Sequence, residues 1–245
     1  MLFIFFILVI VYVYYRRMTS IKVDVSPDII LSPGGYNGFY QLGMCHYIKN
    51  NFNYQNKKLL GFSSGSWASL FMCLKNEHSN ECIKTIFKKI NKCCSLTKMP
   101  AIFKSAIEQY KYSDFDISNL YIGLTDINNK SIHVHHQFLT IKDCLDCCIG
   151  SSFVPYVTYK DLFYFYNHKF VIDGGFYYKK YMQKVDTDKV LVLNYKLFRP
   201  NYNKRGLHFI NFVKPKRNLY DLYLLGYNNA RNNHDYFKKY FHSDS

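Results

Sequence analysis

One serine of this chain lies in a setting that favours nucleophilic chemistry. Ser63 is the centre of a G-x-S-x-G motif whose outer positions are Gly61 and Gly65. The apolar run at 58–62 predicts a strand before the motif, and the apolar stretch at 66–75 predicts a helix after it. Such a sharp turn holds the serine Oγ above the sheet, and the helix behind it directs N–H groups at developing negative charge. Ser63 is therefore a candidate nucleophile.

An activated serine also needs donors for the oxyanion, and a glycine-bearing turn upstream can supply them. Gly34 and Gly35 follow the apolar run at 28–32, and Gly38 opens the helix predicted after the turn. Glycines allow backbone N–H groups to approach a substrate closely at a helix start. The same turn could cradle a phosphate, but no Lys-Ser or Lys-Thr pair follows it as in a nucleotide-binding loop. We therefore interpret Gly34 and Gly35 as oxyanion donors.

The remaining requirement is a general base, for which Asp173 is the candidate. It ends the second strand of a predicted hairpin and precedes Gly174 and Gly175. An aspartate before two glycines is also a common turn former, so its place alone does not establish catalysis. A different possibility is a Ser-Asp-His triad completed by His208, in the chain order of α/β-hydrolases. His208 lies in a basic loop without a pattern that would direct it to the serine.

The segments around these motifs predict an α/β sheet with parallel neighbouring strands. Strand, glycine turn and helix occur twice before residue 76, an arrangement that joins parallel strands through helical crossovers. Further along, the apolar patterns predict strands at 119–125 and 131–138, a hairpin between 159 and 172 with its turn at 167–169, and a last helix at 219–241. No linker or internal repeat divides the chain, so we expect one domain over residues 26–240.

Three motifs follow one another along the chain: the glycine turn, the G-x-S-x-G motif about 25 residues later, and the D-G-G motif about 110 residues after that. In this order and spacing they resemble the patatin-like phospholipase family. Three further stretches are similar to the family in the same order. The sequence at 121–127 is similar to its strand ending in a T-D-L-type turn, that at 148–155 to its A-S-x-A-x-P segment, and that at 225–230 to its terminal helix. The resemblance covers roughly residues 28–235.

The resemblance implies a three-layer α/β/α domain with a central, mostly parallel sheet. It also implies a catalytic dyad of Ser63 and Asp173 that needs no histidine, and an oxyanion hole built by Gly34 and Gly35. The implied reaction is hydrolysis of acyl esters in phospholipids or other lipids.

The chain departs from the family pattern at two positions of the glycine loop. Pro33 occupies the first glycine position, and Asn37 stands where many members carry Arg or Lys. In addition, no Asn-x-Pro follows the D-G-G motif. These departures keep open another interpretation, in which the chain is a catalytically inactive, membrane-associated protein that binds lipid.

Histidines and cysteines in the middle of the chain could be interpreted as a metal cluster. The candidates are His133, His135, His136, Cys144, Cys147 and Cys148. The cysteines fall at i, i+3 and i+4, which is the spacing of a small-residue core face on a helix, and no second paired-ligand motif stands at zinc-site spacing. We therefore expect neither a metal nor a cofactor.

The N-terminal segment predicts a membrane anchor. Residues 1–15 carry no charge and are followed at once by Arg16 and Arg17. As a helix this run is about 22 Å long, shorter than a hydrocarbon core of roughly 30 Å, so crossing requires snorkelling arginines or a thinned bilayer. No basic residue precedes the run and no small-x-small site follows it, as a cleaved signal peptide would require. We expect an uncleaved single-pass anchor at 1–17, with the body in the cytoplasm, where the eight cysteines stay reduced.

Composition and charge indicate a folded, basic protein with an anionic partner. Hydrophobic residues make up 49% of the 245-residue chain, which excludes a disordered or low-complexity chain. A net charge of +15 favours nucleic acid or an anionic membrane surface. The basic residues are scattered over many segments, so we expect a membrane and its lipids as partners, not nucleic acid. The basic helix predicted at 81–92 has either a solvated face over a core stripe or a lipid contact.

Overall fold

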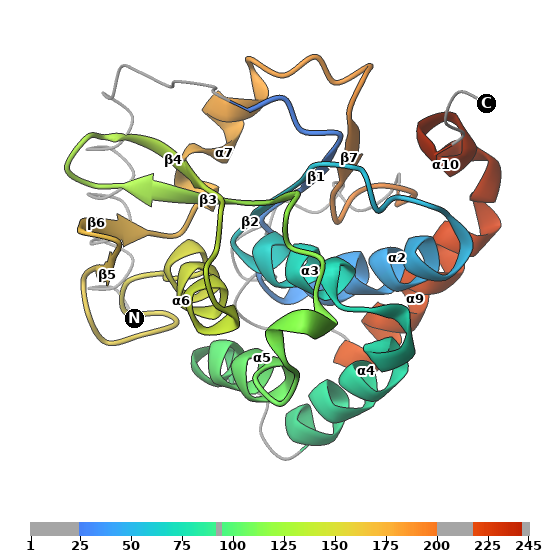
Figure 1. Ribbon diagram of the computed structural model, residues 1–245, viewed down its shortest axis with the longest axis horizontal. Coiled ribbons are helices and arrows are strands. Elements are labelled where there is room, and N and C mark those ends of the chain that lie inside the picture. Colours follow the sequence, from blue (N-terminus) through green and yellow to red (C-terminus); the bar gives the residue numbers. More distant parts are fainter. Residues whose placement is uncertain (1–24, 92–94, 200–217, 242–245) are drawn as a thin grey trace.

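Four parallel strands form the centre of the sheet (Figure 1). The computed structural model describes residues 25–91, 95–199 and 218–241. In their order across the sheet, the parallel strands are β7 (Leu191–Leu193), β1 (Ile29–Leu31), β2 (Leu59–Phe62) and β3 (Leu120–Asp126). The parallel pairing of β1 with β2, predicted from the repeated unit of strand, turn and helix, is confirmed.

Three antiparallel strands extend the sheet beyond β3. They are β4 (Ser131–His135), β5 (Tyr164–Tyr166) and β6 (Lys169–Ile172). Thr125 and Asp126 of β3 pair with both β4 and β6, so these two strands lie on opposite edges of β3. Gly123 pairs with both β4 and β2, so β2 also lies on the edge opposite β4. One edge of β3 therefore carries β2 along its first part and β6 along its end.

Helices cover both faces of this sheet (Figure 1). The larger group consists of α2 (Gly38–Asn51), α3 (Ser64–Cys73), α4 (Asn76–Ile90), α5 (Met99–Ile107), α6 (Ile141–Ser151), α9 (Leu219–Asn232) and α10 (His234–Phe241). α7 (Gly175–Met182) packs on the other face. Short 3-10 turns η1 (Gly35–Asn37), η2 (Leu96–Lys98) and η3 (Tyr112–Asp114) precede α2, α5 and β3. A mixed α/β fold with a central, mostly parallel sheet is thus confirmed.

Side-chain alternation along β1 divides the core in two. Ile29 and Leu31 belong to the larger core under α2 and α3, whereas Ile30 belongs to a smaller core with Tyr177 and Tyr181 of α7. All three β1 side chains are buried, as is typical of parallel strands covered on both faces. Burial on both faces fixes the register of β1 and therefore the position of the glycine turn that follows it.

The last helix differs from its prediction. Instead of one helix at 219–241, α9 ends at Asn232 and α10 begins at His234. Asn233 between them has φ −118° and ψ 36°, and its side-chain amide donates to the carbonyl of Asn229 at 2.8 Å. Such a local side-chain bond competes with continuation of the helix. The prediction of a single helix is wrong for this reason.

The basic helix α4 begins earlier than predicted, at Asn76. Its apolar residues Ile83, Ile86 and Ile90 are buried in the larger core. Lys84 lies on the exposed face. Of the two interpretations of this helix, a solvated face over a core stripe therefore applies.

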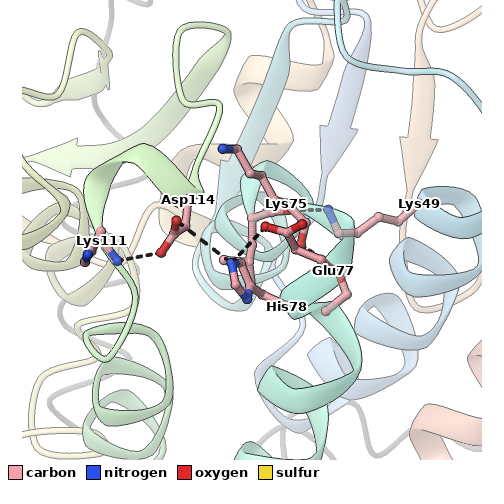
Figure 2. A network of polar contacts seen from close by, with 8 residues as sticks. Lys49, Lys75, Glu77, His78, Lys111 and Asp114 are labelled. Carbon is pink, nitrogen blue, oxygen red and sulfur yellow. Dashed lines mark hydrogen bonds and ion pairs between the residues drawn. The ribbon is translucent and has the colours of Figure 1, made fainter.

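A buried lysine ties α2 to the C-terminal end of α3 (Figure 2). Lys49 donates to the carbonyl of Met72 at 3.1 Å, to the hydroxyl of Tyr54 at 3.2 Å and to the carbonyl of Leu74. Carbonyl oxygens at a helix C-terminus carry partial negative charge, so a cation is favourable there. Burial nevertheless lowers the pKa of Lys49 to about 8.

Close to this lysine, a histidine connects α4 to η3 (Figure 2). His78 Nε2 lies 3.3 Å from the Glu77 carboxylate and 3.9 Å from that of Asp114. Asp114 also accepts the backbone N–H of Lys111 at 2.8 Å. These contacts hold the turn before β3 against the helical layer.

The anchor predicted at 1–17 lies outside the described residues. Within the ranges that the structure does describe, no helix is both long and apolar enough to cross a membrane. The described cysteines are unpaired and buried, namely Cys45, Cys73, Cys82, Cys144, Cys147 and Cys148. Burial raises the pKa of Cys45 and Cys73 above its ordinary value, so these thiols are poor nucleophiles.

Candidate active site

The register of the sheet brings the carboxyl ends of β2 and β6 together. Phe62, the last residue of β2, lies opposite Gly123 of β3, and Ile172, the last residue of β6, lies opposite Thr125. β2 runs parallel to β3 and β6 runs antiparallel to it along the same edge, so only the position of Leu124 separates their ends. The residue that follows each strand therefore enters the same small space.

Ser63 and Asp173 are these two residues, and their side chains are hydrogen-bonded. Ser63 Oγ donates to Asp173 Oδ2 at 2.5 Å, and Asp173 Oδ1 accepts the backbone N–H of Gly175 at 2.7 Å. Both residues are buried, with exposed fractions of 8% and 5%. The structure thus brings the two predicted catalytic residues into direct contact across 110 positions of sequence.

Burial governs the proton affinity of this carboxyl group. Desolvation raises the pKa of Asp173 to about 6, and the hydrogen bonds from Ser63 and Gly175 lower it in part. At neutral pH the group is therefore mostly a carboxylate, yet it accepts a proton more readily than an exposed aspartate does. A serine hydroxyl next to such a group can be deprotonated as it attacks an electrophile.

The turn between β2 and α3 holds Ser63 in a strained backbone conformation. Its φ of 54° and ψ of −125° belong to a region that few non-glycine residues adopt. The flanking glycines allow the turn, because a Cβ at Gly61 would lie 2.6 Å from the carbonyl oxygen of Gly65, and a Cβ at Gly65 would clash with the carbonyl of Leu31. α3 begins directly behind Ser63, so its N-terminal N–H groups face the site.

Ser151, at the end of α6, fills the gap where β2 leaves β3. Its Oγ accepts the backbone N–H of Ser63 at 2.9 Å and donates to the carbonyl of Gly123 at 2.7 Å. Its own carbonyl accepts the N–H of Gly174 at 2.9 Å. One residue therefore holds both segments of the candidate site to the sheet. Its role was not predicted, because a serine at the end of a helix of buried cysteines has no local pattern that indicates such contacts.

The backbone of Asp173 is fixed on both sides. Its N–H donates to the carbonyl of Phe153 at 2.8 Å, and its carbonyl accepts the hydroxyl of Thr125 at 2.9 Å. The next residue, Gly174, lies so close to β3 that a Cβ would clash with the carbonyl of Gly123. The carboxylate is thus held in one position by contacts that do not involve the serine.

The glycine turn lies beside Ser63, the candidate nucleophile, between β1 and α2. Gly35 has a φ of 53°, which glycine adopts without strain, and it lines the same pocket as Ser63 and Gly38. Gly34 and Gly38 pack against Ser64, since a Cβ at these positions would lie 3.2 and 2.9 Å from the Ser64 Oγ. The predicted oxyanion loop therefore adjoins the serine turn, with Gly35 as the predicted donor that lines the pocket.

An apolar pocket that is partly open to solvent leads to the dyad. Its space, counted out to open solvent, is about 630 Å³. Ser63 and Asp173 lie in its wall, and most of the lining comes from α2, α3, α5 and the turn before α5. The apolar lining consists of Tyr36, Phe39, Leu42, Trp67, Ala68, Leu96, Met99, Pro100, Phe103 and Val154. The part from 96 to 103 was not predicted, because nothing in that short helix distinguishes a pocket wall from core.

The described residues of the pocket include neither a histidine nor a set of metal ligands. No histidine of the described ranges lines it. His208, which the alternative triad requires, lies outside the described residues. His133 and His135 lie on β4 with ring centroids 5.9 Å apart, whereas Cys144 is buried in α6. Among residues 25–91, 95–199 and 218–241, no group of three or more potential ligands is arranged to hold a metal ion.

Comparison with known proteins adds no relative to these observations. No protein-family model matches the chain, and no curated protein matches it. The function must therefore be inferred from the residues of the site and from their geometry.

Proposed function

We propose that this protein is a patatin-like lipid acyl hydrolase, a serine esterase of the phospholipase A or lysophospholipase type. Ser63 is the nucleophile and Asp173 is the general base. The observation that carries the proposal is the 2.5 Å hydrogen bond between Ser63 Oγ and Asp173 Oδ2 in the wall of an apolar pocket. The order of the motifs along the chain supports the family assignment and, with it, a three-layer α/β/α domain over residues 26–240.

In the proposed reaction, Asp173 accepts the Ser63 proton while the serine oxygen attacks the ester carbonyl. The same carboxyl group then gives the proton to the leaving alcohol, and an acyl-enzyme remains on Ser63. Water then attacks the acyl-enzyme while Asp173 takes one of its protons, and the carboxyl group returns this proton to Ser63 Oγ as the acyl–oxygen bond breaks and the fatty acid leaves. The hydrogen bond from Gly175 occupies the other carboxylate oxygen, which supports a fixed orientation of Oδ2 toward the serine.

Backbone donors stabilise the negative oxygen of the tetrahedral intermediate in this proposal. We assign this role to the N–H groups of Gly34 and Gly35, and the place of Gly35 in the pocket wall supports it. The N-terminus of α3 adds a favourable potential behind Ser63. Removal of one such donor typically costs about 3 kcal/mol of transition-state stabilisation.

The character of the pocket supports a lipid acyl chain as the group it binds. Its walls are aromatic and aliphatic, and Asp173 is its one ionisable carboxylate among the described lining residues. The proposed substrate is therefore a phospholipid or another acyl-ester lipid. The segment at 1–17 would anchor the domain to the cytoplasmic side of a membrane.

A lipid panel tests the proposal. The full-length protein is incubated with phospholipids, lysolipids and triacylglycerol, and released fatty acid is measured by mass spectrometry. Ser63→Ala should abolish release, and Ser64→Ala is the matched control that should retain turnover within a few-fold of the parent. A fluorophosphonate probe should label the parent protein and the Ser64 variant but not the Ser63 variant.

The same experiment separates the alternatives. A folded parent chain that neither releases fatty acid nor reacts with the probe would be an inactive lipid-binding protein. Loss of turnover in a folded His208→Ala variant would instead indicate the triad.

A further inference from the structure

The β5–β6 hairpin presents phenylalanine side chains to solvent. The outward hairpin patch consists of the exposed residues Leu162, Phe163, Phe165 and Phe170. Phe165 and Phe170 are cross-strand partners with ring centroids 5.4 Å apart, and the rings of Phe163 and Phe170 are 4.6 Å apart. Phe163, Phe165 and Phe170 are 45%, 59% and 37% exposed, so together they leave roughly 300 Å² of surface in contact with water. The solvated face of an antiparallel hairpin is normally polar, so this face indicates an apolar partner.

The outward hairpin patch is not what holds the hairpin in place. On the other face Tyr166 is buried, and its hydroxyl donates to Asp143 of α6 at 2.9 Å. Val171 is buried on that face as well. Because successive residues of a strand point to opposite faces, the outward residues can be replaced without removing these contacts.

The outward hairpin patch and the pocket lie toward the same end of the sheet. β6 approaches from beyond the carboxyl end of β3, since the carbonyl of Phe170 accepts the N–H of Ile127, one residue past β3, at 2.9 Å. The segment 154–163 then connects the two sites. Val154 and Thr158 line the pocket, and the last two residues of the segment belong to the patch. The patch and the pocket therefore share one end of the sheet but lie on opposite faces of it, because Tyr166 and Val171 on the other face of the hairpin belong to the larger core.

Basic residues lie near the outward hairpin patch along the chain. Lys160 precedes the patch, and Lys130 lies in the turn between β3 and β4. Asp161 is an exposed acid in the same region. Lys169 pairs with Tyr166 across the hairpin, so it lies on the face opposite the patch, where it is paired with the buried Asp126 at 3.3 Å. With a net charge of +15 on the whole chain, the electrostatic match is to an anionic surface.

We propose that the outward hairpin patch inserts its phenylalanines into the headgroup layer of an anionic lipid bilayer and turns the end of the sheet that holds the pocket toward that surface. Aromatic rings on a basic protein suit this layer, because the rings enter it while ammonium groups stay at the headgroups. The inference rests on the proposed function, since a lipid hydrolase must take its substrate from an interface. An N-terminal anchor alone would tether the domain without orienting it.

Fluorescence quenching tests insertion without requiring turnover. Full-length protein with Ser63→Ala carries either Phe165→Trp or Leu139→Trp and is mixed with vesicles of phosphatidylglycerol and acyl-brominated phosphatidylcholine. Leu139 is the matched control because it is 86% exposed and lies away from the patch. It follows β4, which runs antiparallel to β3 and therefore ends toward the opposite end of the sheet from the patch. The native Trp67 contributes equally to both. Quenching of the Phe165→Trp protein should exceed that of the control at least twofold, and equal quenching would overturn the proposal.

A second measurement concerns substrate in vesicles. The ratio of turnover on vesicles to turnover on a dispersed short-chain ester should fall at least fivefold in Phe165→Thr/Phe170→Thr protein and stay unchanged in Leu139→Thr protein. If the double variant instead changes the oligomeric state without lowering this ratio, the patch joins two copies of the chain and the lipid proposal is refuted. Selective quenching in a chain that releases no fatty acid would support the docking surface and reject the proposed enzyme.

Discussion

Replacing Asp173 by asparagine tests the proposed base through both activity and stability. Asparagine has nearly the same shape, and its carbonyl oxygen can still accept the N–H of Gly175, which donates to Asp173 Oδ1 at 2.7 Å in the parent. It cannot take a proton from Ser63. Asp173→Asn should therefore fold and lose turnover, while the parent's kcat/KM should rise with pH to a plateau with a midpoint near 6, the pKa to which burial raises this carboxyl group.

The same pKa sets the size of the stability effect. Burial raises the pKa of Asp173 from 3.8 to about 6, and each unit corresponds to about 1.4 kcal/mol, so the ionised group costs the folded state about 3 kcal/mol. The folded protein keeps a proton between pH 4 and 6 that the unfolded chain has released. The free energy of unfolding of the parent therefore falls as pH rises through this window, and the cost is fully present above pH 6.

Urea unfolding in detergent, followed by circular dichroism at pH 4 and pH 8, measures this difference. Other groups titrate alike in parent and variant, so their contributions cancel in the comparison. At pH 4 the unfolded chain has already released part of this proton, so the parent should lose about 2 kcal/mol more than Asp173→Asn between the two pH values. An identical pH dependence in both proteins would refute a buried, weakly acidic carboxyl group. An activity midpoint near 4 would refute it independently.

Further tests address the fold, the buried lysine and the anchor. Gly65→Ala should lower the free energy of unfolding by about 3 kcal/mol or prevent folding, because the added Cβ meets the backbone carbonyl of Leu31. In the control Gly150→Ala, the added Cβ meets only side-chain atoms, so this change should cost less in the same urea titration. The free energy of unfolding of the parent should rise between pH 8 and 10.5, because the folded state releases the Lys49 proton at about pH 8 while the unfolded chain still holds it. The Lys49→Met variant should lack this rise. Full-length protein should remain on membranes through a high-salt wash and leave with detergent, and release by salt alone would contradict an anchor at 1–15.

Local patterns were sufficient for the parts of the fold that depend on neighbours in the sequence. Apolar runs separated by glycine turns predicted the parallel pairing of β1 with β2. The hairpin was also predicted, and its turn residues Asn167 and His168 both have positive φ, 45° and 60°, as two-residue hairpin turns require. β7 was missed because three residues, Leu191–Leu193, are too short for a recognisable pattern. α7 was missed because only Tyr177 and Tyr181 mark its buried stripe.

The contact between Ser63 and Asp173 could not be derived from local patterns. It depends on β2 and β6 sharing one edge of β3, and no residue in either strand encodes that choice of neighbour. Local patterns indicated Ser63 and Asp173 as separate candidates, and the family resemblance implied that they form a pair. Ser151, in contrast, was not predicted as a site residue at all. Its contacts with Ser63 and with Gly123 arise wholly from long-range packing.

The convergence of two strands on one edge of β3 also has a consequence for folding. Ser63 and Asp173 are separated by 110 residues, and closing so long a loop makes their meeting a late event relative to helix formation. During refolding, helical signal should therefore recover before Ser63 becomes reactive toward a fluorophosphonate. A nascent or partly unfolded chain in which β6 is unpaired has a Ser63 without the Asp173 carboxylate, so the proposed hydrolytic activity is expected only once the sheet is complete.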